Sequence, residues 1–122
     1  MSPLRVLLID DEKDLVHTLV ERLTLRGIEA EGVLTGDEAL ARIAEKEFDV
    51  VVQDLKMPGL SGTELLGRIK QARPGVPVIV ITGYGAVRSG EEAIHEGAFD
   101  YLVKPFDIKT LIRVMKASVQ SQ

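Results

Sequence analysis

Five polar side chains stand at the end of short apolar runs, where buried strands would end. They are Asp10, Asp11, Asp54, Thr82 and Lys104. Carboxylates that converge repel one another and raise one another's pKa unless a cation relieves them. Mg²⁺ takes carboxylate and phosphate oxygens as ligands, and a carboxylate can itself attack phosphorus to form an aspartyl phosphate. If these side chains meet, they favour magnesium-assisted phosphoryl transfer to an aspartate.

The lysine and the threonine suit the same chemistry. An ammonium group would stabilise charge on the phosphoryl oxygens, and the Thr82 hydroxyl can donate a hydrogen bond to one of them. Each residue also has an ordinary interpretation. Asp10 and Asp11 would favour the start of a helix, Asp54 would suit a turn, and Lys104 would suit a solvated surface. Their joint placement is what favours a phosphoryl site.

Short apolar runs alternate along the chain with longer amphipathic stretches, which predicts a repeated strand–helix unit. Strands are expected over residues 6–9, 30–34, 50–54, 78–82 and 101–103. The runs are continuous rather than alternating, as is typical of strands buried on both faces. Strict alternation with short connections predicts a parallel sheet covered by helices on both faces. The carboxyl ends of such strands form one edge, so the five polar side chains are expected to converge there.

Local signals predict where several helices begin. Thr35 with Glu38, and Ser61 with Glu64, have the spacing of capping boxes and predict the starts of the second and third helices. Asp107 is a candidate N-cap for the last helix.

Two segments are expected to be less well anchored. Residues 83–85 are expected to form a flexible loop, and the helix after it has a thin apolar face made of Val87, Ala93 and Ile94. Residues 118–122 are expected to be a tail or the start of a linker.

Composition narrows the class of protein. The 122 residues suit a single domain over residues 1–122. The absence of cysteine excludes disulfides, thiolate metal sites and a cysteine nucleophile. A net charge of −4 argues against direct nucleic-acid binding, which needs a basic surface. No apolar stretch is long enough to span a membrane, so we expect a cytoplasmic protein.

Four stretches resemble the response-regulator receiver family of two-component signal transduction. They read LIDDE at 8–12, VQDLKMPG at 52–59, ITGYG at 81–85 and GAFDYLVKPF at 97–106. The resemblance covers essentially the whole chain, and residues 98–102 are also similar to receivers of NtrC-like activators. It implies a flavodoxin-like α/β fold with three αβα layers, a five-stranded parallel sheet in the order 2-1-3-4-5, and five helices.

The resemblance also implies a function and a role for seven residues. A partner histidine kinase or phosphotransfer protein would supply the phosphoryl group, and the surface of the fourth helix, fifth strand and fifth helix would control an output domain or partner. The domain would catalyse only its own modification and would not be a conventional enzyme. The implied roles are phosphoacceptor and metal ligand for Asp54, metal ligands for Asp10, Asp11 and the Lys56 carbonyl, phosphate binding for Thr82 and Lys104, an aromatic switch for Tyr101, and a cis bond between Lys104 and Pro105.

Three alternatives remain open from the sequence. A Mg²⁺-dependent aspartyl-phosphate phosphatase would need an Asp-x-Asp motif after the first strand, where this chain has Asp10-Asp11-Glu12. A flavin-binding module on a similar sheet would need phosphate loops and flanking aromatics, and aromatic residues are few here. A degenerate receiver would lack an intact site. The cognate kinase, the stimulus, the output domain, the oligomeric state and the lifetime of the phosphoryl group are not predicted.

Overall fold

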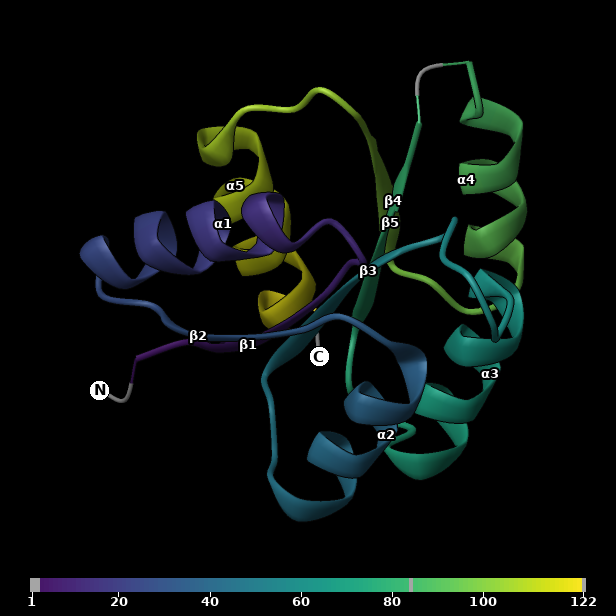
Figure 1. Ribbon diagram of the computed structural model, residues 1–122, viewed down its shortest axis with the longest axis horizontal. Helices are drawn as coiled ribbons and strands as arrows, with labels where there is room; N and C mark the ends of the chain where they lie inside the picture. Colours follow the sequence, from purple (N-terminus) through teal and green to yellow (C-terminus); the bar gives the residue numbers. More distant parts are fainter. Residues whose placement is uncertain (1–2, 84, 122) are drawn as a thin grey trace.

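The computed structural model describes residues 3–83 and 85–121, which form five strands and five helices in strict alternation (Figure 1). The elements in chain order are β1 Arg5–Ile9, α1 Lys13–Leu25, β2 Glu29–Val33, α2 Gly36–Glu45, β3 Val50–Asp54, α3 Gly62–Ala72, β4 Val78–Thr82, α4 Val87–His95, β5 Asp100–Val103 and α5 Ile108–Gln120.

All neighbouring strands pair in parallel, and their order across the sheet is β2-β1-β3-β4-β5. Helices α1 and α5 cover one face, and α2, α3 and α4 cover the other (Figure 1). The flavodoxin-like three-layer fold expected from the sequence is therefore confirmed.

The central strands are buried on both faces, which explains their continuous apolar sequences. Along β1, Leu7 and Ile9 belong to the cluster under α2, α3 and α4, while Val6 and Leu8 belong to the cluster under α1 and α5. Every residue of β3 and β4 is buried. The site residues at the ends of these strands therefore stand on fully buried strands.

The predicted helix starts are confirmed. In each case a side-chain oxygen accepts the backbone N–H three residues further on, as expected of an N-cap. The capping hydrogen bonds run from Glu38 N to Thr35 Oγ1 at 3.1 Å, from Glu64 N to Ser61 Oγ at 3.2 Å, and from Thr110 N to Asp107 Oδ1 at 2.8 Å.

None of the helices in the described ranges is long and apolar enough to cross a membrane.

Three predicted strands differ from the observed ones by one residue. Strands β1 and β5 begin one residue earlier than predicted, at Arg5 and Asp100. Strand β2 is shifted by one residue to Glu29–Val33, because Glu29 pairs with Arg5 and donates its N–H to the Leu4 carbonyl at 2.8 Å. The segment 118–122, expected to be a tail or linker, is helical through Gln120. Ser118 is buried against the core, and its hydroxyl donates to its own helix. Gln122, and Tyr84 in the predicted flexible loop, lie outside the described residues.

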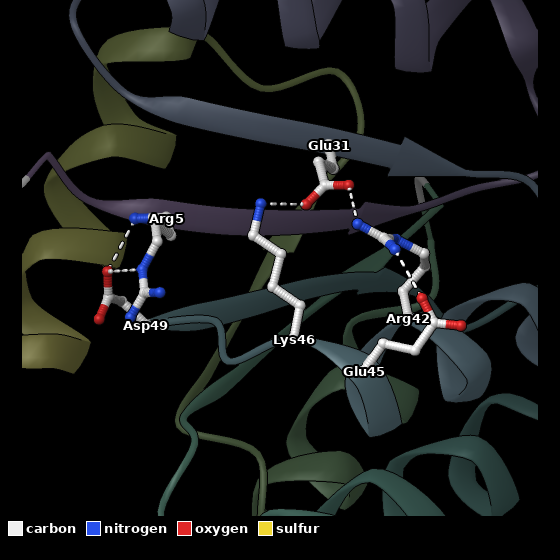
Figure 2. A network of polar contacts seen from close by, with 6 residues as sticks. All are labelled: Arg5, Glu31, Arg42, Glu45, Lys46 and Asp49. Carbon is white, nitrogen blue, oxygen red and sulfur yellow. Dashed lines mark hydrogen bonds and ion pairs between the residues drawn. The ribbon is translucent and has the colours of Figure 1, made fainter.

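Charged pairs tie the edge strand β2 to α2 (Figure 2). Glu31 of β2 accepts hydrogen bonds from Arg42 and from Lys46, the latter at 2.8 Å. Burial alone would raise the pKa of Glu31, but these hydrogen bonds outweigh it and hold the pKa below its usual range. Because all three side chains are about one-third exposed, solvent screens these ion pairs and each adds little to the stability of the fold.

Candidate functional site

The predicted site residues gather at the carboxyl edge of the sheet. Asp10 directly follows β1, Asp54 ends β3, Thr82 ends β4 and Lys104 directly follows β5. The register places Asp54 opposite Ile81 and Thr82 opposite Val103. Parallel pairing thus brings together four side chains that are far apart in sequence.

The Lys104 ammonium lies at the centre of the site. Its Nζ donates to Asp54 Oδ2 at 2.8 Å, to Asp10 Oδ2 at 3.0 Å and to Glu12 Oε1 at 2.8 Å. An ammonium has three donors, and all three are used. One cation therefore bridges the ends of β1, β3 and β5.

The other oxygen of each buried aspartate is held by its own loop. Asp10 Oδ1 accepts the backbone N–H of Glu12 at 3.0 Å, and Asp54 Oδ1 accepts the backbone N–H of Lys56 at 2.8 Å. In both cases the donor lies two residues after the aspartate, which is the Asx-turn pattern. Each carboxylate is fixed at one oxygen by backbone and at the other by Lys104.

The site holds more negative than positive charge. Asp10 and Asp54 are 4% and 5% exposed, and burial raises the pKa of Asp10 above its ordinary value. Burial alone would lower the pKa of Lys104, but hydrogen bonds to Asp54, Glu12 and Asp10 hold it above its usual range. Three carboxylates against one ammonium leave two negative charges uncompensated when all are ionised.

The geometry fits a hard divalent cation. Asp10, Glu12 and Asp54 each offer a carboxylate oxygen, and these atoms lie within 4.8 Å of one another. Such oxygens are the donors that Mg²⁺ takes. Asp11, which the sequence places in the metal site, is exposed and is not part of this group. Glu12 is part of it, although the predicted site omits it; its only sequence signal is that it continues the acidic run.

Thr82 and the peptide bond after Lys104 are two further features of this edge. The Thr82 hydroxyl oxygen is buried and has no hydrogen-bond partner among the described residues. A buried hydroxyl without a partner is costly, so Thr82 is suited to donate to an oxygen that arrives with a ligand. The bond between Lys104 and Pro105 is cis, as expected from the resemblance.

Tyr101 lies on β5, three residues before Lys104, and is half-buried against the core under α4. Its ring packs directly on Gly90 of α4, where an added Cβ would come within 2.5 Å of the ring Cγ. The absence of a side chain at Gly90 therefore makes room for the aromatic ring.

Comparisons with known proteins agree with this architecture. Residues 6–116 match the family described as the response regulator receiver domain. The chain is 42% identical over 108 residues to response regulator protein FleR of Pseudomonas aeruginosa. The aligned residues make up 88% of this chain and 23% of that protein. It is 36% identical over 114 residues to the DNA-binding transcriptional regulator NtrC of Salmonella typhimurium, covering 93% and 24%.

A solved structure shows the same fold. A response regulator receiver domain protein from Clostridium thermocellum superposes with a TM-score of 0.91 at 33% identity, covering 97% of this chain and 95% of that one. The chain spans about a quarter of the length of the curated relatives named above.

The parallel sheet with an acidic, lysine-bridged edge, together with the family match, defines a signalling domain. The chain belongs to the response-regulator receiver family of two-component systems.

Removing the bridging ammonium should destabilise the fold. In Lys104→Met, Asp10 and Asp54 stay buried without their cation, and we expect a loss of about 1–3 kcal/mol in the free energy of unfolding, since the lysine is partly solvated. Urea unfolding at neutral pH without divalent ions measures it. Lys109→Met, at an exposed position of α5, is the control. A loss below about 0.5 kcal/mol, the usual effect of a surface substitution, would show that Lys104 is not the stabilising bridge.

Proposed function

We propose that this domain is a phosphorylation-dependent switch in which Asp54 accepts a phosphoryl group from a partner histidine kinase or phosphotransfer protein in the cytoplasm. The observation that carries the proposal is the buried Asp54 carboxylate at the sheet edge, bridged by Lys104 to Asp10. Membership of the receiver family supports it.

Mg²⁺ is the proposed cofactor, held by Asp10, Asp11, Asp54 and the Lys56 carbonyl. When bound, it would neutralise the carboxylates and the charge on the transferring phosphoryl oxygens. The acidic group fits such an ion. Glu12 is the alternative to Asp11 as the metal ligand that follows Asp10, because its carboxylate already lies in the group with Asp10 and Asp54.

The transfer itself needs little from the protein beyond positioning and charge. A carboxylate oxygen of Asp54 forms the new bond to phosphorus as the P–N bond of the phosphohistidine breaks, and the imidazole leaves with the electron pair. Lys104 then pairs with a phosphoryl oxygen, and the Thr82 hydroxyl donates to another. The hydroxyl has no competing partner to give up among the described residues.

The signal is proposed to leave through β4, α4 and β5. Movement of Thr82 toward the phosphoryl group would open space beside β4, into which Tyr101 can rotate. That rotation releases the ring from Gly90 and so loosens α4. Three apolar side chains on and after α4 are more than one-third exposed, which suits a surface that meets a partner. They are Val87, Ile94 and Phe99.

The energy available limits how far the isolated domain can switch. Inverting a 1:99 population requires about 5.5 kcal/mol of differential stabilisation. One new ion pair and one charge-assisted hydrogen bond, at about 1.5–3 kcal/mol each, give about 3–6 kcal/mol together and reach that value only at the top of the range. A partner or output domain that binds the surface formed by α4, β5 and α5 is therefore proposed to complete the shift.

Asp54 is predicted to be the sole phosphorylated residue. Incubation with acetyl phosphate and Mg²⁺, followed by peptide mass analysis, should place the added phosphoryl group on Asp54. Asp54→Asn should abolish labelling. Asp49→Asn, just before β3 at the opposite edge of the sheet, should be labelled like the wild type. Full labelling of Asp54→Asn would refute the assignment.

Mg²⁺ should stabilise the folded chain because it binds the folded state. The expected gain is about 2.7 kcal/mol at a hundredfold excess over the dissociation constant. Thermal unfolding with and without Mg²⁺ measures it.

Comparing Asp11→Asn with Glu12→Gln identifies the second acidic ligand. We expect Asp11→Asn to lose most of the gain and Glu12→Gln to keep it. The reverse result would transfer the role to Glu12. A gain as large as that of the wild-type chain in both variants would exclude both residues.

A further inference from the structure

Gln53 is a polar residue whose partners on both neighbouring strands are apolar. It lies in β3 between Ile9 of β1 and Val80 of β4 and is fully buried. Its Oε1 has no hydrogen-bond partner among the described residues. Burying an amide with an unpartnered oxygen is unfavourable compared with an apolar side chain of the same size. Gln53 therefore lowers the stability of the fold relative to an apolar residue, and packing of the core does not explain why it is there.

The other end of the amide makes one long-range contact. Gln53 Nε2 donates to the carbonyl oxygen of Gly62, the first residue of α3, at 3.0 Å. A carbonyl oxygen can accept two hydrogen bonds, so this bond does not compete with the helix. It ties the end of β3 to the start of α3.

A second contact closes the same loop. An added Cβ on Gly62 would lie 2.4 Å from the backbone oxygen of Leu55, so the two backbones touch and only glycine fits. Residues 55–61 thus form a loop whose ends are joined by the Gln53 hydrogen bond and by this backbone contact.

This loop carries the group that orients Asp54. The Lys56 N–H donates to Asp54 Oδ1, and the Lys56 side chain is exposed. The packing of Leu55, Met57 and Leu60 against the core is only partial. The position of the Lys56 N–H therefore depends on how firmly the ends of the loop are held.

We propose that Gln53 is a positioning residue for the acceptor carboxylate: its hydrogen bond to Gly62 holds the loop 55–61 in the conformation in which Lys56 fixes Asp54. This inference rests on the proposed role of Asp54 as phosphoacceptor. Gln53 is fully buried, and in this proposal it acts through the backbone of the loop.

The test is Gln53→Met, which keeps the size of the side chain and removes both the hydrogen bond and the unpartnered oxygen. The Lys56 amide should exchange with solvent about two- to tenfold faster, the equivalent of one net hydrogen bond. The rate of phosphorylation by acetyl phosphate, measured per folded molecule at saturating Mg²⁺, should fall by a similar factor. In the wild-type chain, one side-chain N–H of Gln53 should be protected from exchange.

Val51→Ala is the matched control, because Val51 lies on the same face of β3 two residues before Gln53 and contributes only packing. It should lower stability without changing either the Lys56 exchange or the phosphorylation rate per folded molecule. Unchanged exchange in Gln53→Met, or an equal fall in rate in Val51→Ala, would overturn the inference.

The two proposals fail in different ways. A wild-type chain that is not labelled at Asp54 would remove the proposed function, and with it the positioning role. Normal labelling of the wild type with an unchanged rate in Gln53→Met would remove only the role of Gln53.

Discussion

The structure of the site depends on one lysine ammonium held among three carboxylates. Lys104 uses all its donors on Asp10, Glu12 and Asp54, and no other cation contacts these oxygens in the described part of the chain. Such a cluster forms only if the ends of β1, β3 and β5 lie at one edge, which the parallel order of the sheet ensures. The charge is unbalanced even so, and the surplus is what makes the edge receptive to a further cation.

The same contacts suit the switch proposed above. In that proposal Lys104 leaves a carboxylate oxygen to reach a phosphoryl oxygen, while the buried Thr82 hydroxyl has no partner to leave among the described residues. The proposed rearrangement exchanges ion pairs and leaves the core intact. We propose that its effect extends to α4 through Tyr101, whose ring fills the space above Gly90. Helix α4 has few buried side chains, so it is the element that can repack at the lowest cost.

Much of this arrangement was predictable because it follows from local patterns. Continuous apolar runs define buried strands, and the caps at Thr35, Ser61 and Asp107 form as their sequences predict. The convergence of Asp10, Asp54, Thr82 and Lys104 follows from strand order. Other features depend on contacts that only the folded chain reveals. The inclusion of Glu12, and the exclusion of Asp11, depend on side-chain direction after β1. The role proposed for Gln53 depends on its tertiary hydrogen bond to Gly62.

The most direct test of the central claim, that charge at Asp54 is transmitted to α4 and β5, is amide NMR with Mg²⁺ and the phosphoryl mimic beryllofluoride. Large chemical-shift changes are expected over residues 85–96 and 101–106 as well as around Asp54. They should shrink in Thr82→Ala while beryllofluoride binding is retained. Changes confined to residues 10–12 and 54–56 in the wild-type chain would contradict the account, even if Asp54 were the phosphorylated residue.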